Sequence, residues 1–214
     1  MSVVFTDNFT VGANTNIDAY PAAGADYAYN LGSGANLTVN AANDRVQQTA
    51  TGADHAARII DASVPTTDQQ MSITSFSSGS EDSTGNACVR MKTDGTGNFY
   101  LCYASKNGGN ILIYRVVAGA FTQIASGTRT WTPPSTLIFK ATGTNPVSLL
   151  ANIAGTADLT FDDSNASRHQ TGVPGIHMFS TTINVSYIDD VSVDDLGTGG
   201  GLTDGQSLLW VGVT

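Results

Sequence analysis

Basic residues are scarce in this sequence. Nine lysines and arginines stand against 18 acidic residues, which gives a formal net charge of −9. The nine are scattered along the chain and form no basic cluster. Binding to a nucleic-acid backbone depends on clustered Lys and Arg side chains that neutralise phosphates. The sequence therefore argues against a nucleic-acid partner.

Long apolar runs are also missing. No stretch approaches the roughly 20 consecutive apolar residues that a helix needs to cross a bilayer, so no membrane partner is predicted. The first nine residues, MSVVFTDNF, lack the basic region and the apolar region of a secretory signal. We therefore expect the protein to fold in the compartment where it is made, unless a signal has been removed.

Helical periodicity is absent as well. No run of ten or more residues has the i, i+3, i+4, i+7 apolar spacing of an amphipathic helix. The chain instead combines 23 glycines with short β-branched and aromatic segments, and only 13% of its residues are charged. Its 214 residues suffice for one domain with a sizeable core. These features predict an all-β protein, a two-sheet antiparallel β-sandwich of the jelly-roll type.

The residues of common catalytic sites are few. Glu81 is the sole glutamate, and retaining glycoside hydrolysis generally needs two carboxyl groups about 5 Å apart. Paired aspartates are adjacent in sequence, so on a strand they point to opposite faces. The three histidines form no zinc-binding motif, and no serine stands in a G-x-S-x-G motif. We predict a protein without catalytic activity.

Residues 86–126 predict four antiparallel strands joined by three glycine-bearing turns. Matching apolar positions across these strands gives one almost wholly apolar face, which we expect to face the core. This register puts Val89 beside Leu101, Leu101 beside Tyr114 and Tyr114 beside Ile124. The prediction is half of a sandwich with one apolar and one mixed face.

The mixed face carries a row formed by Arg90, Tyr100, Arg115 and Gln123. Aromatic rings stack on sugars, and guanidinium and amide groups bind hydroxyls, so this row is a candidate glycan-binding or partner-binding surface. Trp131 is a candidate aromatic at its rim. In the alternative interpretation, Tyr100 covers the arginine stems on a solvated or subunit-covered face and Trp131 lies in the core.

Cysteine occurs twice. The predicted register makes Cys88 and Cys102 cross-strand neighbours on the mixed face, so a disulfide is geometrically possible. Because no secretory signal is seen, two reduced and partly buried thiols are the favoured state.

Several motifs follow one another in a distinctive order. They are Asp7-Asn8-Phe9, Val89-Arg90, Asn98-Phe99-Tyr100-Leu101, Leu112-Ile113-Tyr114-Arg115, Gly172-Val173-Pro174-Gly175-Ile176 and Tyr187-Ile188-Asp189-Asp190-Val191-Ser192-Val193. In this order they resemble the concanavalin A-like lectin/glucanase superfamily, in its laminin-G-like and glucanase-like branch. The resemblance implies two antiparallel sheets, one of them concave. It does not fix the function, because the superfamily includes glycosidases, glycan-binding modules and structural proteins of phage virions.

The resemblance also implies a structural Ca²⁺ ion. Jelly rolls of this kind often bind calcium through an aspartate of the last strand and backbone carbonyls near the first strand. By the matching motif, Asp190 is the candidate ligand, Asp189 is the other choice and Asp7 lies nearby. Hard oxygen ligands suit calcium. An ordinary carboxylate at the sheet edge is the alternative.

The chain divides into a jelly-roll domain, residues 1–196, and a C-terminal segment, residues 197–214. The segment begins with a flexible GTGGG linker and continues into the apolar stretch SLLWVGV. This stretch either forms a last strand of the domain or latches onto a neighbouring subunit. Its apolar residues are Leu208, Leu209, Trp210 and Val211.

These observations predict a structural or adhesion module of a larger assembly, such as a decoration or tail-type protein on the surface of a phage virion. Such a module would bind a protein partner in that assembly. A homo-oligomer and binding to glycans are further options. The alternative is a calcium-dependent carbohydrate-binding module of a secreted, glycan-active protein, which would be extracellular.

Overall fold

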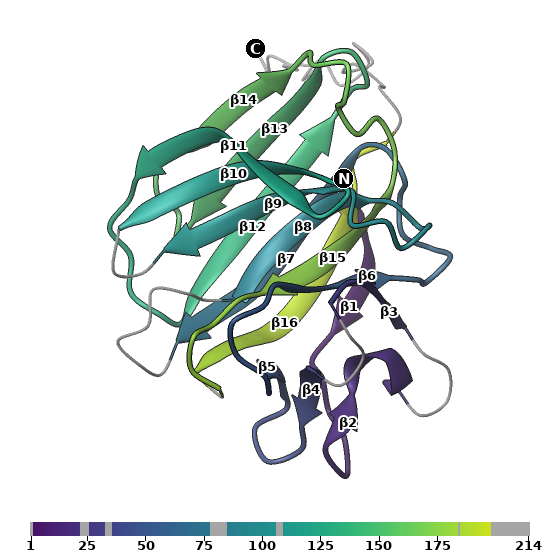
Figure 1. Cartoon of the computed structure of the whole chain (residues 1–214), viewed down its shortest axis with the longest axis vertical. Coiled ribbons are helices and arrows are strands. Elements are labelled where there is room, and N and C mark those ends of the chain that lie inside the picture. The colour runs from purple at the N-terminus through teal and green to yellow at the C-terminus, as the bar shows by residue number, and fades with distance from the viewer. Residues whose placement is uncertain are drawn as a thin grey trace, which may run out of the picture.

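The computed structural model describes residues 2–21, 26–32, 36–77, 85–105, 109–183 and 185–197. These residues form sixteen strands and one short 3-10 helix, η1 (Ile17–Ala19). The strands make two sheets with antiparallel pairing, packed face to face as Figure 1 shows. This confirms the predicted two-sheet sandwich. In the described part of the chain, no helix has the length and apolar character required to cross a membrane.

The larger sheet has nine strands in the order β14-β13-β12-β7-β16-β5-β4-β2, with β1 paired to β16 beside this path. Its strands β4 and β5 pair across a short turn at residues 41–44. The bounds are β1 (Ser2–Asp7), β2 (Thr15–Asn16), β4 (Leu37–Asn40), β5 (Arg45–Gln48), β7 (Gln69–Ser77), β12 (Ser135–Thr142), β13 (Val147–Ile153), β14 (Leu159–Asp163) and β16 (Ser186–Asp195).

The smaller sheet has seven strands in the order β11-β10-β9-β8-β15-β6-β3. The bounds are β3 (Tyr27–Leu31), β6 (His55–Ile59), β8 (Gly85–Met91), β9 (Phe99–Ser105), β10 (Asn110–Val117), β11 (Ala120–Thr128) and β15 (Val173–Met178). Strands β8 to β11 are consecutive neighbours, so the predicted four-stranded meander is confirmed.

The register within this meander is partly as predicted. Between β9 and β10, Leu101 lies opposite Tyr114 and Tyr100 opposite Arg115, as expected. Between β8 and β9 the prediction is wrong by one residue, because Val89 lies opposite Tyr100. The reason is the backbone of Arg90, which has a φ of +54° and so departs from the extended conformation of a regular strand. The prediction assumed regular alternation through this position.

A second irregularity shifts β11. The ladder between β10 and β11 is interrupted between Ile113 and Tyr114, and Tyr114 lies opposite Gln123. The predicted pairs of Tyr114 with Ile124 and of Arg115 with Gln123 are therefore wrong. A bulge adds one residue to one strand, which breaks the strict alternation on which the prediction depends.

The two cysteines are not cross-strand neighbours. Cys102 lies opposite Ala87, and Cys88 lies opposite Leu101, so the two thiols project from opposite faces of the sheet. Both are free and buried, which confirms the reduced state. Burial raises the pKa of both thiols, so they remain protonated and unreactive.

On β9 and β10 the two faces of the meander are inverted relative to the prediction, whereas on β8 Ala87 and Val89 belong to the main core as predicted. Tyr100, Cys102 and Ile113 of the mixed face are fully buried and belong to the main core between the two sheets. Phe99 and Leu101, from the face predicted to be apolar and core-facing, belong to a second cluster made only by strands of the seven-stranded sheet. On β9 and β10 the face assigned to the core is therefore the outer face, which is turned away from the nine-stranded sheet.

Charge pairing explains how the mixed face is accommodated inside. Arg115 Nη1 lies 2.9 and 3.0 Å from the two carboxylate oxygens of Asp163, on β14 of the other sheet. The Tyr100 hydroxyl donates to Asp163 Oδ2 over 2.7 Å. Buried charges are tolerated when they are paired and hydrogen-bonded. One aspartate thus makes a polar row compatible with the core.

Candidate functional site

The residues of the predicted glycan-binding row do not form a surface. Arg90 and Tyr100 are fully buried, and Trp131 is 9% exposed. Arg115 is held by Asp163, so Gln123 on β11 is the one exposed residue of this row. The structure thus corrects the predicted row, and it places Trp131 in the core as the alternative interpretation had it.

Arg90 is held by carbonyl groups. Its guanidinium donates to the carbonyl oxygens of Gly143 (2.6 Å), His169 (3.2 Å) and Thr67 (3.2 Å). Asp68 Oδ1 lies 3.5 Å from Nη2. Burial lowers the pKa of Arg90, and the charge of Asp68 opposes that shift. This arginine ties loops to the core and is closed to a ligand.

The apolar C-terminal stretch with Leu208, Leu209, Trp210 and Val211 lies outside the described residues. Its role as a last strand or as a latch stays a prediction.

Two of the three predicted calcium ligands come together. Asp7 on β1 and Asp190 on β16 line one cavity of about 420 Å³. The pairing of the two strands puts Asp7 opposite Val191, next to Asp190. Asp190 has a φ of +47° at a bulge in the β16–β7 ladder, and this bulge displaces it from regular alternation.

The oxygens around this cavity are not all free. Asp7 Oδ1 accepts hydrogen bonds from the Tyr20 hydroxyl (2.7 Å) and the Phe9 N–H (2.8 Å), whereas Oδ2 is buried and has no hydrogen bond within the geometric limits among the described residues. Asp189 Oδ1 accepts the Asp190 N–H instead, and burial together with the Asp190 charge raises the pKa of Asp189. Asp7 and Asp190 are therefore the better calcium candidates.

The fit to calcium depends on further ligands. Within the described ranges, no group of three or more His, Cys, Asp or Glu side chains could hold a metal. Calcium accepts six to eight oxygens, including backbone carbonyls and waters. Two carboxylates on one cavity fit such an ion.

The outer face of the seven-stranded sheet carries a cluster of rings. Tyr114 on β10 and Phe121 on β11 are partly buried, with their ring centroids 6.2 Å apart in an edge-to-face arrangement. Phe99 lies 6.2 Å and His177 5.9 Å from Phe121, and both are buried. Phe99 and His177 thus form the base under two more accessible rings.

A chain of hydrogen bonds fixes the orientation of His177. The Ala104 N–H donates to Asn86 Oδ1 over 3.0 Å, so the Asn86 amide nitrogen faces His177 Nδ1 at 3.4 Å. Nδ1 then accepts, and the proton sits on Nε2, which donates to Asp54 Oδ1 over 3.0 Å. A buried histidine on the outer face of the sheet thus orients a carboxylate at the surface.

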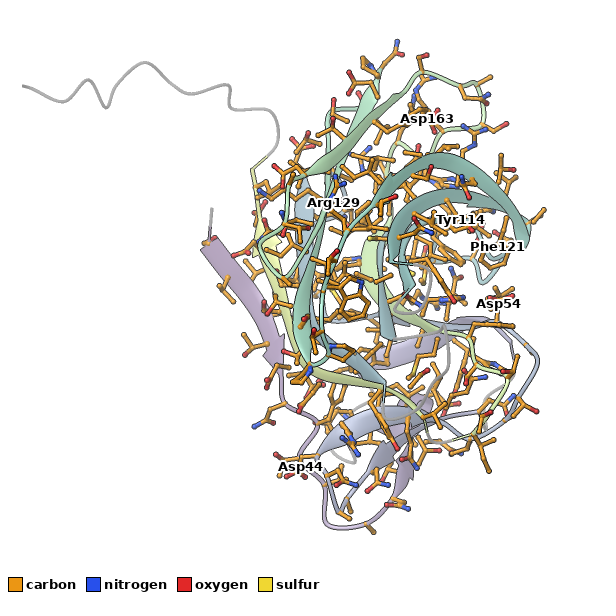
Figure 2. All side chains as sticks on the ribbon, turned by 90° about the vertical axis from the view of Figure 1, so that its left-hand side faces the viewer. Asp44, Asp54, Tyr114, Phe121, Arg129 and Asp163 are labelled. Carbon is orange, nitrogen blue, oxygen red and sulfur yellow. The ribbon has the colours of Figure 1, made fainter. Side chains whose placement is uncertain are left out.

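Asp54 is open to solvent on its other side. Its side chain is 37% exposed, whereas that of His177 is 1% exposed. Burial and the Asp54 charge raise the pKa of the Tyr114 hydroxyl, which therefore stays neutral. Figure 2 shows Tyr114, Phe121 and Asp54 on the same side of the molecule. Rings beside an oriented carboxylate can stack on a flat molecule and accept hydrogen bonds from its hydroxyls.

Sequence reasoning missed this site. It put Tyr114 on the apolar face of the meander but assigned that face to the core, and it gave His177 no functional role. One signal was available. Tyr103 and Tyr114 both place hydroxyls on the apolar face, and buried tyrosines need hydrogen-bond partners. A face with two tyrosines is therefore better suited to the boundary with water.

No family model and no curated protein matches this sequence. Solved structures match over most of its length. The carbohydrate-binding module CBM66 from Bacillus subtilis is 14% identical, with 76% of this chain and 94% of that chain covered and a TM-score of 0.54. The VIP36 exoplasmic/lumenal domain in its Ca²⁺/Man2-bound form is 10% identical, with 85% and 86% covered and a TM-score of 0.55.

A protein of unknown function with a galectin-like fold from Bacillus subtilis is 10% identical, with 88% of this chain and 97% of that chain covered and a TM-score of 0.56. The chain has a lectin-like sandwich fold. Sequence identities this low show the fold alone. The fold that these structures share with this chain is consistent with the concanavalin A-like resemblance. The comparisons give no support to the predicted phage link.

Proposed function

We propose that this protein binds carbohydrate on the outer face of its seven-stranded sheet. The observation that carries the proposal is the placement of Tyr114 and Phe121 beside Asp54, whose carboxylate is oriented by His177. An aromatic ring offers a flat apolar surface to the C–H face of a sugar. A carboxylate oxygen accepts hydrogen bonds from its hydroxyls.

The similar structures support a glycan as the ligand. One is named a carbohydrate-binding module, and another is described with a bound mannose disaccharide. Carbohydrate binding was the alternative function predicted from the sequence. The predicted role as a module of a larger assembly depends on the C-terminal segment, and it stays a separate prediction.

We propose binding without turnover. Among the described residues, the candidate site contributes one carboxylate, Asp54. Glycoside hydrolysis generally uses two carboxyl groups on either side of the bond that is cleaved. A single oriented carboxylate suits recognition of hydroxyls.

The test begins with a broad glycan array, followed by titration calorimetry on the strongest ligand. We expect Tyr114→Ala and Phe121→Ala each to weaken binding by about tenfold or more, because a lost stacking ring costs about 1.4 kcal/mol or more. We expect a similar loss for Asp54→Asn, which keeps the shape and removes the charge.

Thr122→Ala is the matched control, because Thr122 is exposed on the same strand as Phe121 and, as its direct neighbour in the strand, points to the other face. It should bind like the wild type. An array without any ligand would contradict the proposal. So would unchanged affinity in both aromatic variants.

We also infer that calcium binds between Asp7 and Asp190. A ligand at 100 times its dissociation constant stabilises a protein by about 2.7 kcal/mol, or about 5–10 °C in Tm for a chain of this size. We therefore expect calcium to raise the Tm of chelator-treated protein, as measured by scanning calorimetry. The rise should disappear in Asp190→Asn and persist in the control Asp189→Asn. A Tm that does not respond to calcium would contradict the inference.

A further inference from the structure

A smaller cavity, of about 220 Å³, adjoins the candidate site. It is lined by residues 29–32 at the end of β3, residues 95–97 before β9, and the turn at 118–119 that leads into Phe121. A Cβ atom added to Gly32 would lie 3.0 Å from the Asp54 carbonyl oxygen. The cavity therefore extends from the neighbourhood of Asp54 to that of Phe121.

Asn30 lines this cavity, and its side chain has no hydrogen bond among the described residues. Asn30 is 4% exposed, and neither its Nδ2 nor its Oδ1 has a hydrogen-bond partner in the described part of the chain. Buried polar atoms without a partner are rare in folded proteins, and each one calls for an explanation. An amide that offers both a donor and an acceptor fits a polar guest in the adjoining space.

His55 is a second unpaired group in the same place. It is 1% exposed, and Nδ1 and Nε2 both lack partners among the described residues. A Cβ at Gly32 would come within 2.3 Å of Nδ1, so only glycine allows this packing. Burial, and to a lesser extent the nearby His177, lowers the pKa of His55. The ring is therefore neutral, with one donor and one acceptor.

We propose that this cavity receives the terminal sugar ring of a glycan whose next ring lies on Tyr114 and Phe121. This inference rests on the proposed carbohydrate binding and specifies recognition of a chain end. Sugar hydroxyls both donate and accept hydrogen bonds, as the Asn30 amide requires. The volume is below the roughly 300–1,000 Å³ of pockets for drug-sized ligands, so it suits a single ring.

The test uses Asn30→Leu, a substitution of similar size that removes the amide. The probes are the methyl glycosides of mannose, galactose and glucose and the corresponding disaccharides, titrated by calorimetry. We expect one methyl glycoside to bind within tenfold of its disaccharide, because the cavity holds the terminal ring. Asn30→Leu should lower both affinities at least tenfold and leave the Tm equal or higher, since it removes an unpaired buried amide.

A second variant fills the cavity from another element. Ala118 is exposed and lines the cavity, so Ala118→Leu should also lower the affinity at least tenfold. Ala120→Leu makes the same change at an exposed position outside the lining and should bind like the wild type.

Wild-type affinity in a folded Asn30→Leu or Ala118→Leu protein would overturn the inference. If Phe121→Ala then still loses affinity, the proposed carbohydrate binding stands without the cavity. If Phe121→Ala also binds normally, both proposals fail.

Discussion

Replacing Asp163 with alanine is expected to lower the free energy of unfolding by about 3–5 kcal/mol, the usual cost of removing one partner of a buried ion pair. Asp163 is 1% exposed. Its oxygens accept hydrogen bonds from Arg115 Nη1, the Tyr100 hydroxyl and the Asn165 N–H. Without the carboxylate, a guanidinium at 13% side-chain exposure loses the ion-pair partner that the structure shows, and the two sheets lose a polar connection.

Denaturation by urea, followed by circular dichroism, measures this loss. Asp162→Ala is the matched control, because Asp162 is exposed and its side chain bonds Ser148 at the surface. It should change stability by about 0.5 kcal/mol or less. A double-mutant cycle with Arg115→Met should give a coupling of about 0.5–3 kcal/mol. Equal effects of Asp162→Ala and Asp163→Ala would refute the assigned role.

Gly172→Ala is expected to destabilise the protein by about 3 kcal/mol or more, at the high end for a single substitution. Gly172 has a φ of +144°, and a Cβ there would lie 2.3 Å from the Arg90 carbonyl carbon and 2.7 Å from the Met91 oxygen. These are backbone atoms, so no side-chain rotation relieves the overlap. The Gly172 N–H bonds the Thr66 oxygen, and its carbonyl accepts Gln69 Nε2, each over 2.8 Å. The segment is therefore held on both sides.

Gly155→Ala separates this overlap from the cost of the backbone conformation. Gly155 has a φ of +67°, and a Cβ there would meet nothing within 4 Å. It should lose only about 1–2 kcal/mol, the cost of a left-handed conformation for an L-residue. Thermal and urea denaturation of both variants give the comparison. If Gly172→Ala is no worse than Gly155→Ala, the overlap has been accommodated and the explanation is wrong.

The strands and the sandwich were predictable because they depend on local signals. Alternating β-branched and aromatic residues between glycine turns locate β8 to β11, and apolar matching pairs Leu101 with Tyr114 correctly. The bulges were not predictable, since a single residue such as Arg90 leaves the alternation for reasons that lie elsewhere in the fold. Its guanidinium reaches carbonyl oxygens up to 79 positions away in sequence.

The inward face of the meander depended on a distant partner in the same way. Asp163 is 63 residues from Tyr100, and without that carboxylate the row with Arg115 would be unsuited to the core. The candidate site has the same origin. His177 and Asp54 are 123 positions apart and meet because β15 pairs with β6, a strand order that local patterns do not contain.

The two thiols on opposite faces of β8 and β9 have a consequence for handling the protein. They cannot bond to each other within the folded domain, and their burial keeps them from reagents in solution. Folding therefore needs neither an oxidant nor a disulfide isomerase. A reducing agent should leave the domain intact, and the same native structure is accessible in reducing and in oxidising surroundings.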